Sequence, residues 1–113
     1  MNVAETILAQ IKETVGMNVY FSWGAHALKS MTQENLESLD INNGRGALLF
    51  RVSGHHYKGQ VLVVLNGKDL YDIYFCSIRV GTIKISEKVT DLYFDQIGDF
   101  IDKKVEYISE YVS

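Results

Sequence analysis

The sequence has a single cysteine, no long apolar run and no secretory signal pattern. Because Cys76 is alone, it cannot form an intramolecular disulfide, and its place in an apolar stretch predicts a small buried hydrophobic residue in a reducing compartment. No stretch approaches the roughly 20 apolar residues of a membrane span, and the N-terminus lacks a charged segment followed by an apolar one. These features predict a cytoplasmic protein with no membrane partner.

Positive charge is also sparse. The chain has 11 Lys and Arg against 14 Asp and Glu, a formal net charge of −3. Its basic residues are scattered and form no stripe along the sequence, so the composition disfavours nucleic acid as a partner. A nucleic-acid-binding accessory module is the alternative, because basic residues far apart in the sequence can converge on neighbouring strand ends. The candidates for such a surface are Lys58, Lys68, Arg79 and Lys84.

Catalytic and cofactor signatures are missing as well. The histidines His26, His55 and His56 lack the further ligands that a metal site needs, and no glycines have the spacing of a phosphate-binding loop. We therefore expect no metal, no cofactor and no enzymatic activity. A small enzyme with a site near Asp69 and Asp72 is a second alternative, since two carboxylates can divide acid and base roles. Turn capping is the more ordinary role of such residues.

With 113 residues, 47% of them hydrophobic, the chain predicts one domain over residues 1–113. Its central stretch, 65–79, joins a turn at Asn66-Gly67 to a strand rich in Tyr, Ile and Phe. We expect a hairpin with positive φ at Gly67. Alternate strand residues face opposite sides of a sheet, so Tyr74 or Phe75, whichever faces the helices, is predicted to be core.

The flanking segments supply the rest of an α+β fold. Asn2 and Glu5 have capping-box spacing before a helix that runs to about Val15 and ends at Gly16. Strands are predicted over 18–23, 47–52, 60–65 and 82–89, with 60–65 in the sheet interior. Trp23 is predicted to be a core residue with a paired indole N–H. Residues 25–41 are left open between a helix and a loop with a helical turn. The whole predicts an antiparallel sheet of four to five strands packed against N-terminal and long C-terminal helices.

The C-terminal helix is predicted to begin with a cap at Thr90 or Asp91 and to place apolar residues three or four apart from Phe94 to Val112. Its carboxylates have the same spacing and form a stripe about 130° around the helix from the apolar one. A solvated outer face is the ordinary explanation of such a stripe. The functional interpretation is a partner-binding face made of Asp95, Asp99, Asp102 and Glu106.

Short motifs spread over most of the chain carry a resemblance to a known family. They are Gly-Met-Asn at 16–18, Gly-Ala at 24–25, apolar strands at 48–52 and 63–65, Asp-Leu-Tyr-Asp at 69–72 with Phe75 following, and Tyr-Phe-Asp-Gln at 93–96. In these motifs the chain resembles a family of small uncharacterised proteins of phages and other mobile elements of gut bacteria. It differs from that pattern at Trp23, where the family usually has a smaller residue, and by an insertion at 30–43.

The resemblance implies a mobile-element origin, and the family has no assigned activity. Together with the small size of the chain and its lack of a catalytic grouping, it predicts an accessory protein that binds a host or defence protein stoichiometrically, in the cytoplasm of a bacterial host. An inhibitor of bacterial immunity, such as an anti-CRISPR, is the sharpest form of this hypothesis. The sequence leaves a homodimer open.

Overall fold

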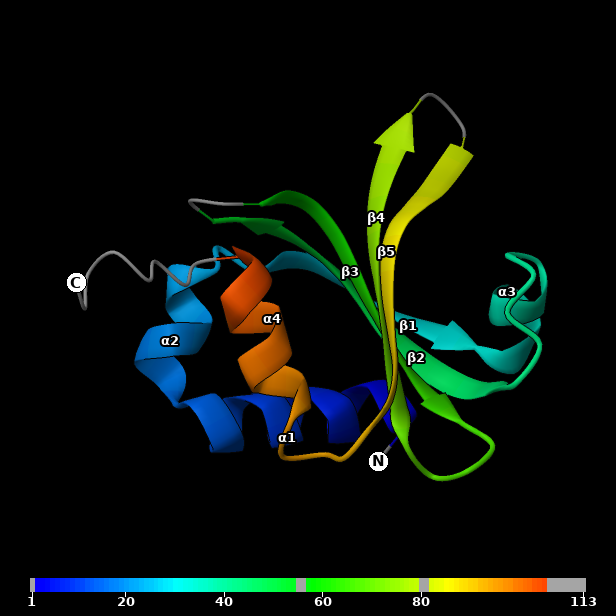
Figure 1. The fold of residues 1–113 in the computed structure, drawn as a ribbon, viewed down its shortest axis with the longest axis horizontal. Helices are drawn as coiled ribbons and strands as arrows, with labels where there is room; N and C mark the ends of the chain where they lie inside the picture. The colour runs from blue at the N-terminus through cyan, green and yellow to red at the C-terminus, as the bar shows by residue number, and fades with distance from the viewer. Residues whose placement is uncertain (1, 55–56, 80–81, 106–113) are drawn as a thin grey trace.

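The structure, a computed structural model, describes residues 2–54, 57–79 and 82–105. It is an α+β fold, as expected, with a five-stranded antiparallel sheet whose strands lie in chain order (Figure 1). The strands are β1 (His26–Thr32), β2 (Gly44–Ser53), β3 (Lys58–Asn66), β4 (Tyr71–Arg79) and β5 (Thr82–Leu92), and the helices are α1 (Val3–Val15), α2 (Met17–Ser22), α3 (Gln33–Glu37) and α4 (Ile97–Val105).

The twisted sheet carries helices on both faces (Figure 1). On one face, which we call the three-helix face, α1, α2 and α4 cover the larger core, and on the other α3 covers a smaller one, so we call it the α3 face. Side chains alternate between them: Phe50 on β2 packs toward the three helices, and its neighbour Leu49 faces α3. The central strand β3 buries residues on both faces, which confirms the predicted interior strand.

The first helix has the predicted limits. The Asn2 Oδ1 atom accepts a hydrogen bond from the backbone N–H of Glu5 at 2.8 Å. At the other end, the N–H of Gly16 donates to the carbonyl of Lys12, and Gly16 takes a φ of 84° that residues with a Cβ rarely adopt.

The prediction of a strand over 18–23 is wrong, because Met17–Ser22 forms helix α2. Its aromatic and β-branched residues favour strands in isolation, but packing decides the conformation here. As a helix, the segment directs Tyr20 and the following Trp23 into the core on the three-helix face. The two rings meet edge to face, with centroids 5.8 Å apart.

The segment left open over 25–41 is mainly a strand followed by a short helix. Only Met31 is buried along β1, which is an edge strand, so the alternation that identifies a strand is missing. A register shift between His26 and Lys29 breaks the pattern further. Helix α3 then starts with a reciprocal capping box between Thr32 and Asn35.

The hairpin between β3 and β4 is present, but its positive φ falls on Asp69 (62°) and not on Gly67. The Asn66 carbonyl accepts from the N–H of Asp69, and the Asn66 Oδ1 accepts from the N–H groups of Lys68 and Leu70. This is a three-residue hairpin loop whose last residue is left-handed. Aspartate tolerates that conformation better than most residues do, so the position of the glycine does not identify the left-handed residue of this turn.

The described residues do not form the long C-terminal helix that the sequence predicts from Thr90 or Asp91 onward. Strand β5 continues to Leu92 and so includes Thr90 and Asp91, the predicted helix caps. Leu92 pairs with Tyr71, and the N–H of Asp91 donates to the Asp72 carboxylate. A turn in which the Gln96 Oε1 accepts from the N–H of Tyr93 then leads into α4, which has nine residues. The predicted continuation over 106–112 lies outside the described residues.

Helix α4 crosses α1 at Gly98, which is buried against Val15. A Cβ placed on Gly98 would overlap with the Cγ1 atom of Val15. We therefore expect Gly98→Ala to lower the free energy of unfolding by about 1–3 kcal/mol, the usual cost of overpacking. Helix propensity alone would raise it by about 1 kcal/mol. Denaturant titration gives the sign, and Lys103→Ala, an exposed change in the same helix, should stay within about 0.5 kcal/mol of the parent. A stabilised Gly98→Ala variant would show that the two helices separate easily.

Candidate protein-binding surface

The acidic residues singled out by the sequence have unequal surroundings. Asp95 lies in the turn before α4 and Asp99 in its first turn, and both are exposed. Asp102 is half-buried, and its Oδ1 accepts a hydrogen bond from the Trp23 indole at 3.0 Å. Glu106 lies outside the described residues. The structure thus offers Asp95 and Asp99 to a partner, and it gives Asp102 a role in holding α4 to the core.

Cationic side chains of α4 do not neutralise these carboxylates. The Lys104 ammonium lies 2.9 Å from Glu87 on β5 and also sits over the rings of Tyr57 and Phe75. In the part of the chain that the structure describes, neither Asp95 nor Asp99 forms an ion pair. A partner can therefore meet both charges without breaking an ion pair between described residues.

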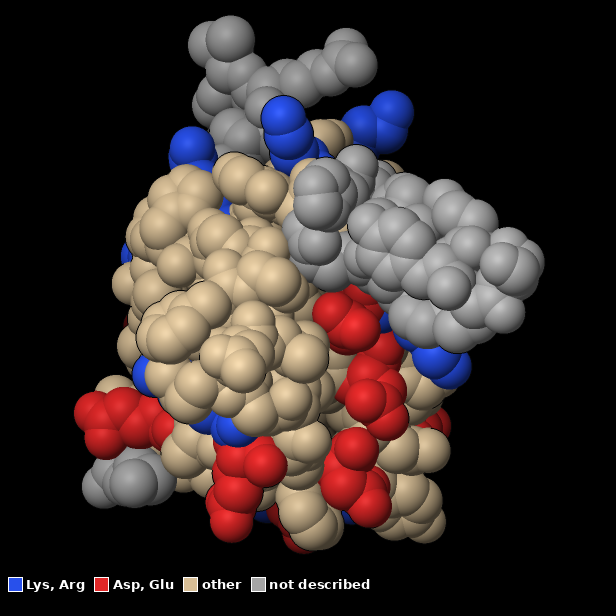
Figure 2. Space-filling model, turned by 90° about the vertical axis from the view of Figure 1, so that its left-hand side faces the viewer, with Lys and Arg blue, Asp and Glu red and all other residues tan. Residues whose placement is uncertain are grey.

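An apolar region adjoins this acidic one. Met17 and Phe21 on α2 are 44% and 66% exposed, and their four-residue spacing places them on one side of the helix. The bond between Asp102 and Trp23, which directly follows α2, holds the two helices side by side (Figure 1). Figure 2, which views the molecule from this end, shows a column of acidic side chains beside a broad uncharged area.

We call the combination of Met17, Phe21, Asp95 and Asp99 the α2–α4 surface. The prediction of a strand over 18–23 hides its apolar half, because positions four apart in a strand share a face but lie roughly 13 Å from each other, whereas in a helix they are neighbours. The helical spacing of a methionine and a phenylalanine was the signal that could have identified it.

The two carboxylates of the enzyme alternative serve a turn. Asp69 is exposed and lies 2.8 Å from Arg45, and Asp72 accepts from the Asn66 side chain and from the N–H of Asp91. A polar cleft of about 350 Å³ adjoins Asp72, but its described lining residues include neither Asp69 nor a histidine. Among the described residues, the structure thus does not bring Asp69, Asp72 and a histidine into one cleft.

Cys76 is fully buried on the α3 face, as the sequence indicated. Burial raises the pKa of its thiol to about 11, so it is protonated at neutral pH and a poor nucleophile. Among the described residues, no group of three or more His, Cys, Asp or Glu is arranged to hold a metal ion.

The basic residues of the nucleic-acid alternative do not all converge. Lys58 opens β3, and Lys68 follows the opposite end of the same strand, where it pairs with Asp91. Lys84 lies near the same end of the sheet as Lys58, and the side chain of Arg79 is outside the described ones. The described helices include none with the length and apolarity to cross a membrane.

Comparison with known proteins adds no relative: no family model, curated protein or solved structure matches this chain. Function must therefore be argued from the geometry of the chain itself.

Proposed function

We propose that the protein acts by binding another protein through the α2–α4 surface. The observation that carries this proposal is the exposure of Phe21, two-thirds open to solvent, on α2. The hydrogen bond of Trp23 joins this helix to α4, where Asp99 is exposed, with Asp95 exposed in the preceding turn. Phenylalanine and methionine are enriched in the buried centres of protein interfaces, and charged residues are usual at their rims. Scattered exposed hydrophobic residues are common, but a methionine and a phenylalanine together on one short helix beside an acidic edge form a surface suited to a partner.

The partner should present an apolar pocket for Phe21 flanked by lysine or arginine side chains for Asp95 and Asp99. A host or defence protein is the class of partner that the mobile-element resemblance supports, and inhibition by occlusion, as in an anti-CRISPR, is the form of action we propose. Many such target proteins have basic surfaces because they bind nucleic acid. An acidic surface with an apolar centre would compete for that region.

The test begins with capture of a partner from host extract by the parent protein and by Phe21→Ser, which removes the apolar anchor. For the captured protein, association rates are then measured at low and high salt with the parent and with Asp95→Lys/Asp99→Lys. Charge complementarity acts mainly on the association rate. We expect the double variant to associate at least about tenfold more slowly at low salt and to lose most of the salt dependence.

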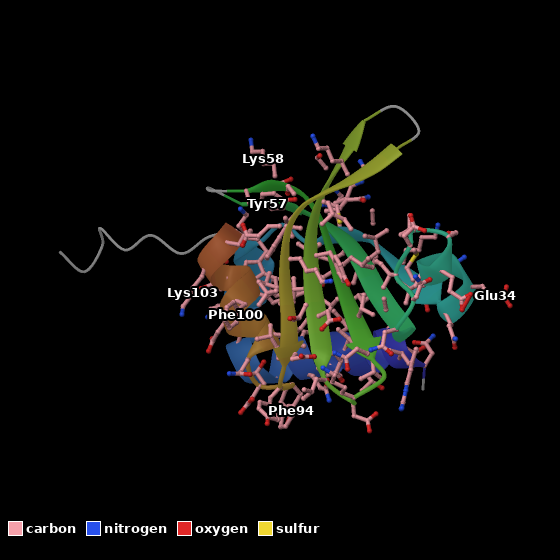
Figure 3. All side chains as sticks on the ribbon, turned by 45° about the vertical axis from the view of Figure 1, so that its right-hand side comes forward. Glu34, Tyr57, Lys58, Phe94, Phe100 and Lys103 are labelled. Atoms are coloured by element: carbon pink, nitrogen blue, oxygen red, sulfur yellow. The ribbon has the colours of Figure 1, made fainter. Side chains whose placement is uncertain are left out.

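The matched control is Glu34→Lys/Glu37→Lys on α3, which makes the same charge change far from the α2–α4 surface (Figure 3). It should leave the association rate near that of the parent. Both double variants should unfold within about 1 kcal/mol of the parent, because all four positions are exposed. Equal rates and equal salt slopes for the two double variants, with equal capture by Phe21→Ser, would overturn the proposal.

A further inference from the structure

A cleft of about 490 Å³ opens near the end of the sheet at which β3 begins. This volume falls within the range of about 300–1,000 Å³ that is usual for small-molecule sites. Its described lining comes from the four strands β1 to β4. The side chains used in the argument are His26, Arg51, Lys58 and Gln60.

Strand register places three of these residues in one row across the sheet. His26 on β1 lies opposite Arg51 on β2, and Arg51 lies opposite Gln60 on β3. Directly opposed residues in antiparallel strands direct their side chains to the same face, with Cβ atoms roughly 4.5–5.5 Å apart. Gln60 also lies opposite Cys76, whose side chain is on the α3 face, so the row belongs to that face.

The amide of Gln60 is buried without full hydrogen bonding. Only 7% of Gln60 is exposed, and its Oε1 atom has no hydrogen-bond partner in the described part of the protein. A buried acceptor without a donor is unfavourable, and native structures keep few of them. Along the same strand, the equivalent positions Leu62 and Val64 are apolar. A polar residue at this position therefore requires an explanation outside core packing.

The charged side chains among the described lining residues of the cleft are all basic, in a chain with a net charge of −3. Arg51 and Lys58 are exposed, and within the described residues neither forms an ion pair. In His26 the Nδ1 atom lies 2.7 Å from the carbonyl of Gly24, so Nδ1 donates its proton there and Nε2 is left for another contact. No carboxylate is among the described lining residues.

From this arrangement we propose that the cleft binds a small organic anion. Its phosphate or carboxylate group contacts Arg51 and Lys58, and an N–H or O–H group of the same molecule donates to Gln60 Oε1. The guanidinium of Arg51 offers the paired donors that suit both anions. Adenosine monophosphate is a suitable first probe, because a glutamine amide pairs with the amino group and ring nitrogen of adenine.

The experiment measures binding of adenosine monophosphate, adenosine, inorganic phosphate and glutamate by calorimetry and by NMR of the Gln60 amide and Arg51 guanidinium signals. Adenosine monophosphate should bind at least about tenfold more tightly than adenosine or inorganic phosphate, because each of those offers one of the two contacts. Tighter binding of glutamate would identify a carboxylate ligand and also supports the site. If none of the four shifts the Gln60 and Arg51 signals, the proposal is wrong.

Variants separate a binding role from a structural one. Arg51→Gln and Lys58→Gln should each weaken binding by about tenfold or more, and Lys103→Gln, the same charge change on the far side of the sheet (Figure 3), should not. Gln60→Met removes the unpaired acceptor with little change of side-chain volume. We expect this variant to bind adenosine monophosphate more weakly, because the contact with Gln60 Oε1 is lost, and to have a higher denaturation midpoint than the parent. A lowered midpoint with unchanged binding would show that Gln60 serves only the fold, and would overturn its assignment as a ligand contact.

Discussion

Replacing Phe75 with alanine is expected to lower the free energy of unfolding by about 3–5 kcal/mol. Phe75 is 1% exposed on β4 and faces the three helices. Its ring meets Tyr57 edge to face at 5.6 Å, and the Lys104 ammonium lies 5.7 Å from its centroid. Alanine would remove the apolar burial, leave a cavity and lose the contacts of the ring with Tyr57, which precedes β3, and with Lys104 on α4.

Urea titration with circular dichroism measures this loss, and Tyr74 supplies the comparison. Tyr74 is 5% exposed and packs on the α3 face, where its ring lies 5.4 Å from the Lys88 ammonium. Tyr74→Phe keeps the ring and should cost less than about 1.5 kcal/mol. If Phe75→Ala unfolds at the same urea concentration as the parent, the assignment of β4 as a core strand is incorrect.

The second large effect is expected at Trp23, whose loss to alanine should also cost about 3–5 kcal/mol. Trp23 is completely buried between the end of α2 and α4. Removing only its partner isolates the hydrogen bond: Asp102→Ala leaves the indole N–H without an acceptor and should cost about 1–3 kcal/mol. Asp102→Asn retains an Oδ1 acceptor and should cost less than Asp102→Ala.

Because Trp23 is the only tryptophan, its fluorescence follows the same region in the two Asp102 variants during unfolding. Equal stabilities of Asp102→Ala and Asp102→Asn would mean that the bond contributes nothing. Because of its hydrogen bond with Trp23, Asp102 belongs to the fold, whereas Asp95 and Asp99 can be changed to test binding alone. A lysine at Asp102 would disturb folding and binding together.

Much of the fold could be predicted because its central strands have clear local signals. The alternation around Phe75, the unbroken apolar run of β3 and the caps of α1 each reflect contacts that a sequence pattern records. The sequence does not predict helix α2 or strand β1, and the reasons differ. In α2, strand-forming residues are held in a helix by the packing of Tyr20 and Trp23, and β1 is an edge strand that buries only Met31.

The candidate sites were harder to predict because they depend on distant residues coming together. The spacing of the acidic residues from Asp95 onward is visible in the sequence, but the hydrogen bond between Asp102 and Trp23 joins positions far apart in the chain. Likewise, Arg51 and Gln60 become neighbours only through the register of β2 and β3. The sequence shows which residues are charged, and strand pairing determines which of them meet.

The strand order β1 to β5 also has a consequence for how the chain folds. Each strand pairs with the next one along the sequence. Short loops join β2 to β3, β3 to β4 and β4 to β5, whereas the longer segment 33–43, which contains α3, joins β1 to β2. Such local pairing favours rapid folding compared with sheets that join distant strands. The contact between Gly98 and Val15 is different, because it joins α4 and α1 from opposite parts of the chain. Bringing these two helices together therefore closes a much longer loop than any of the strand pairings does, and it costs correspondingly more loop-closure entropy.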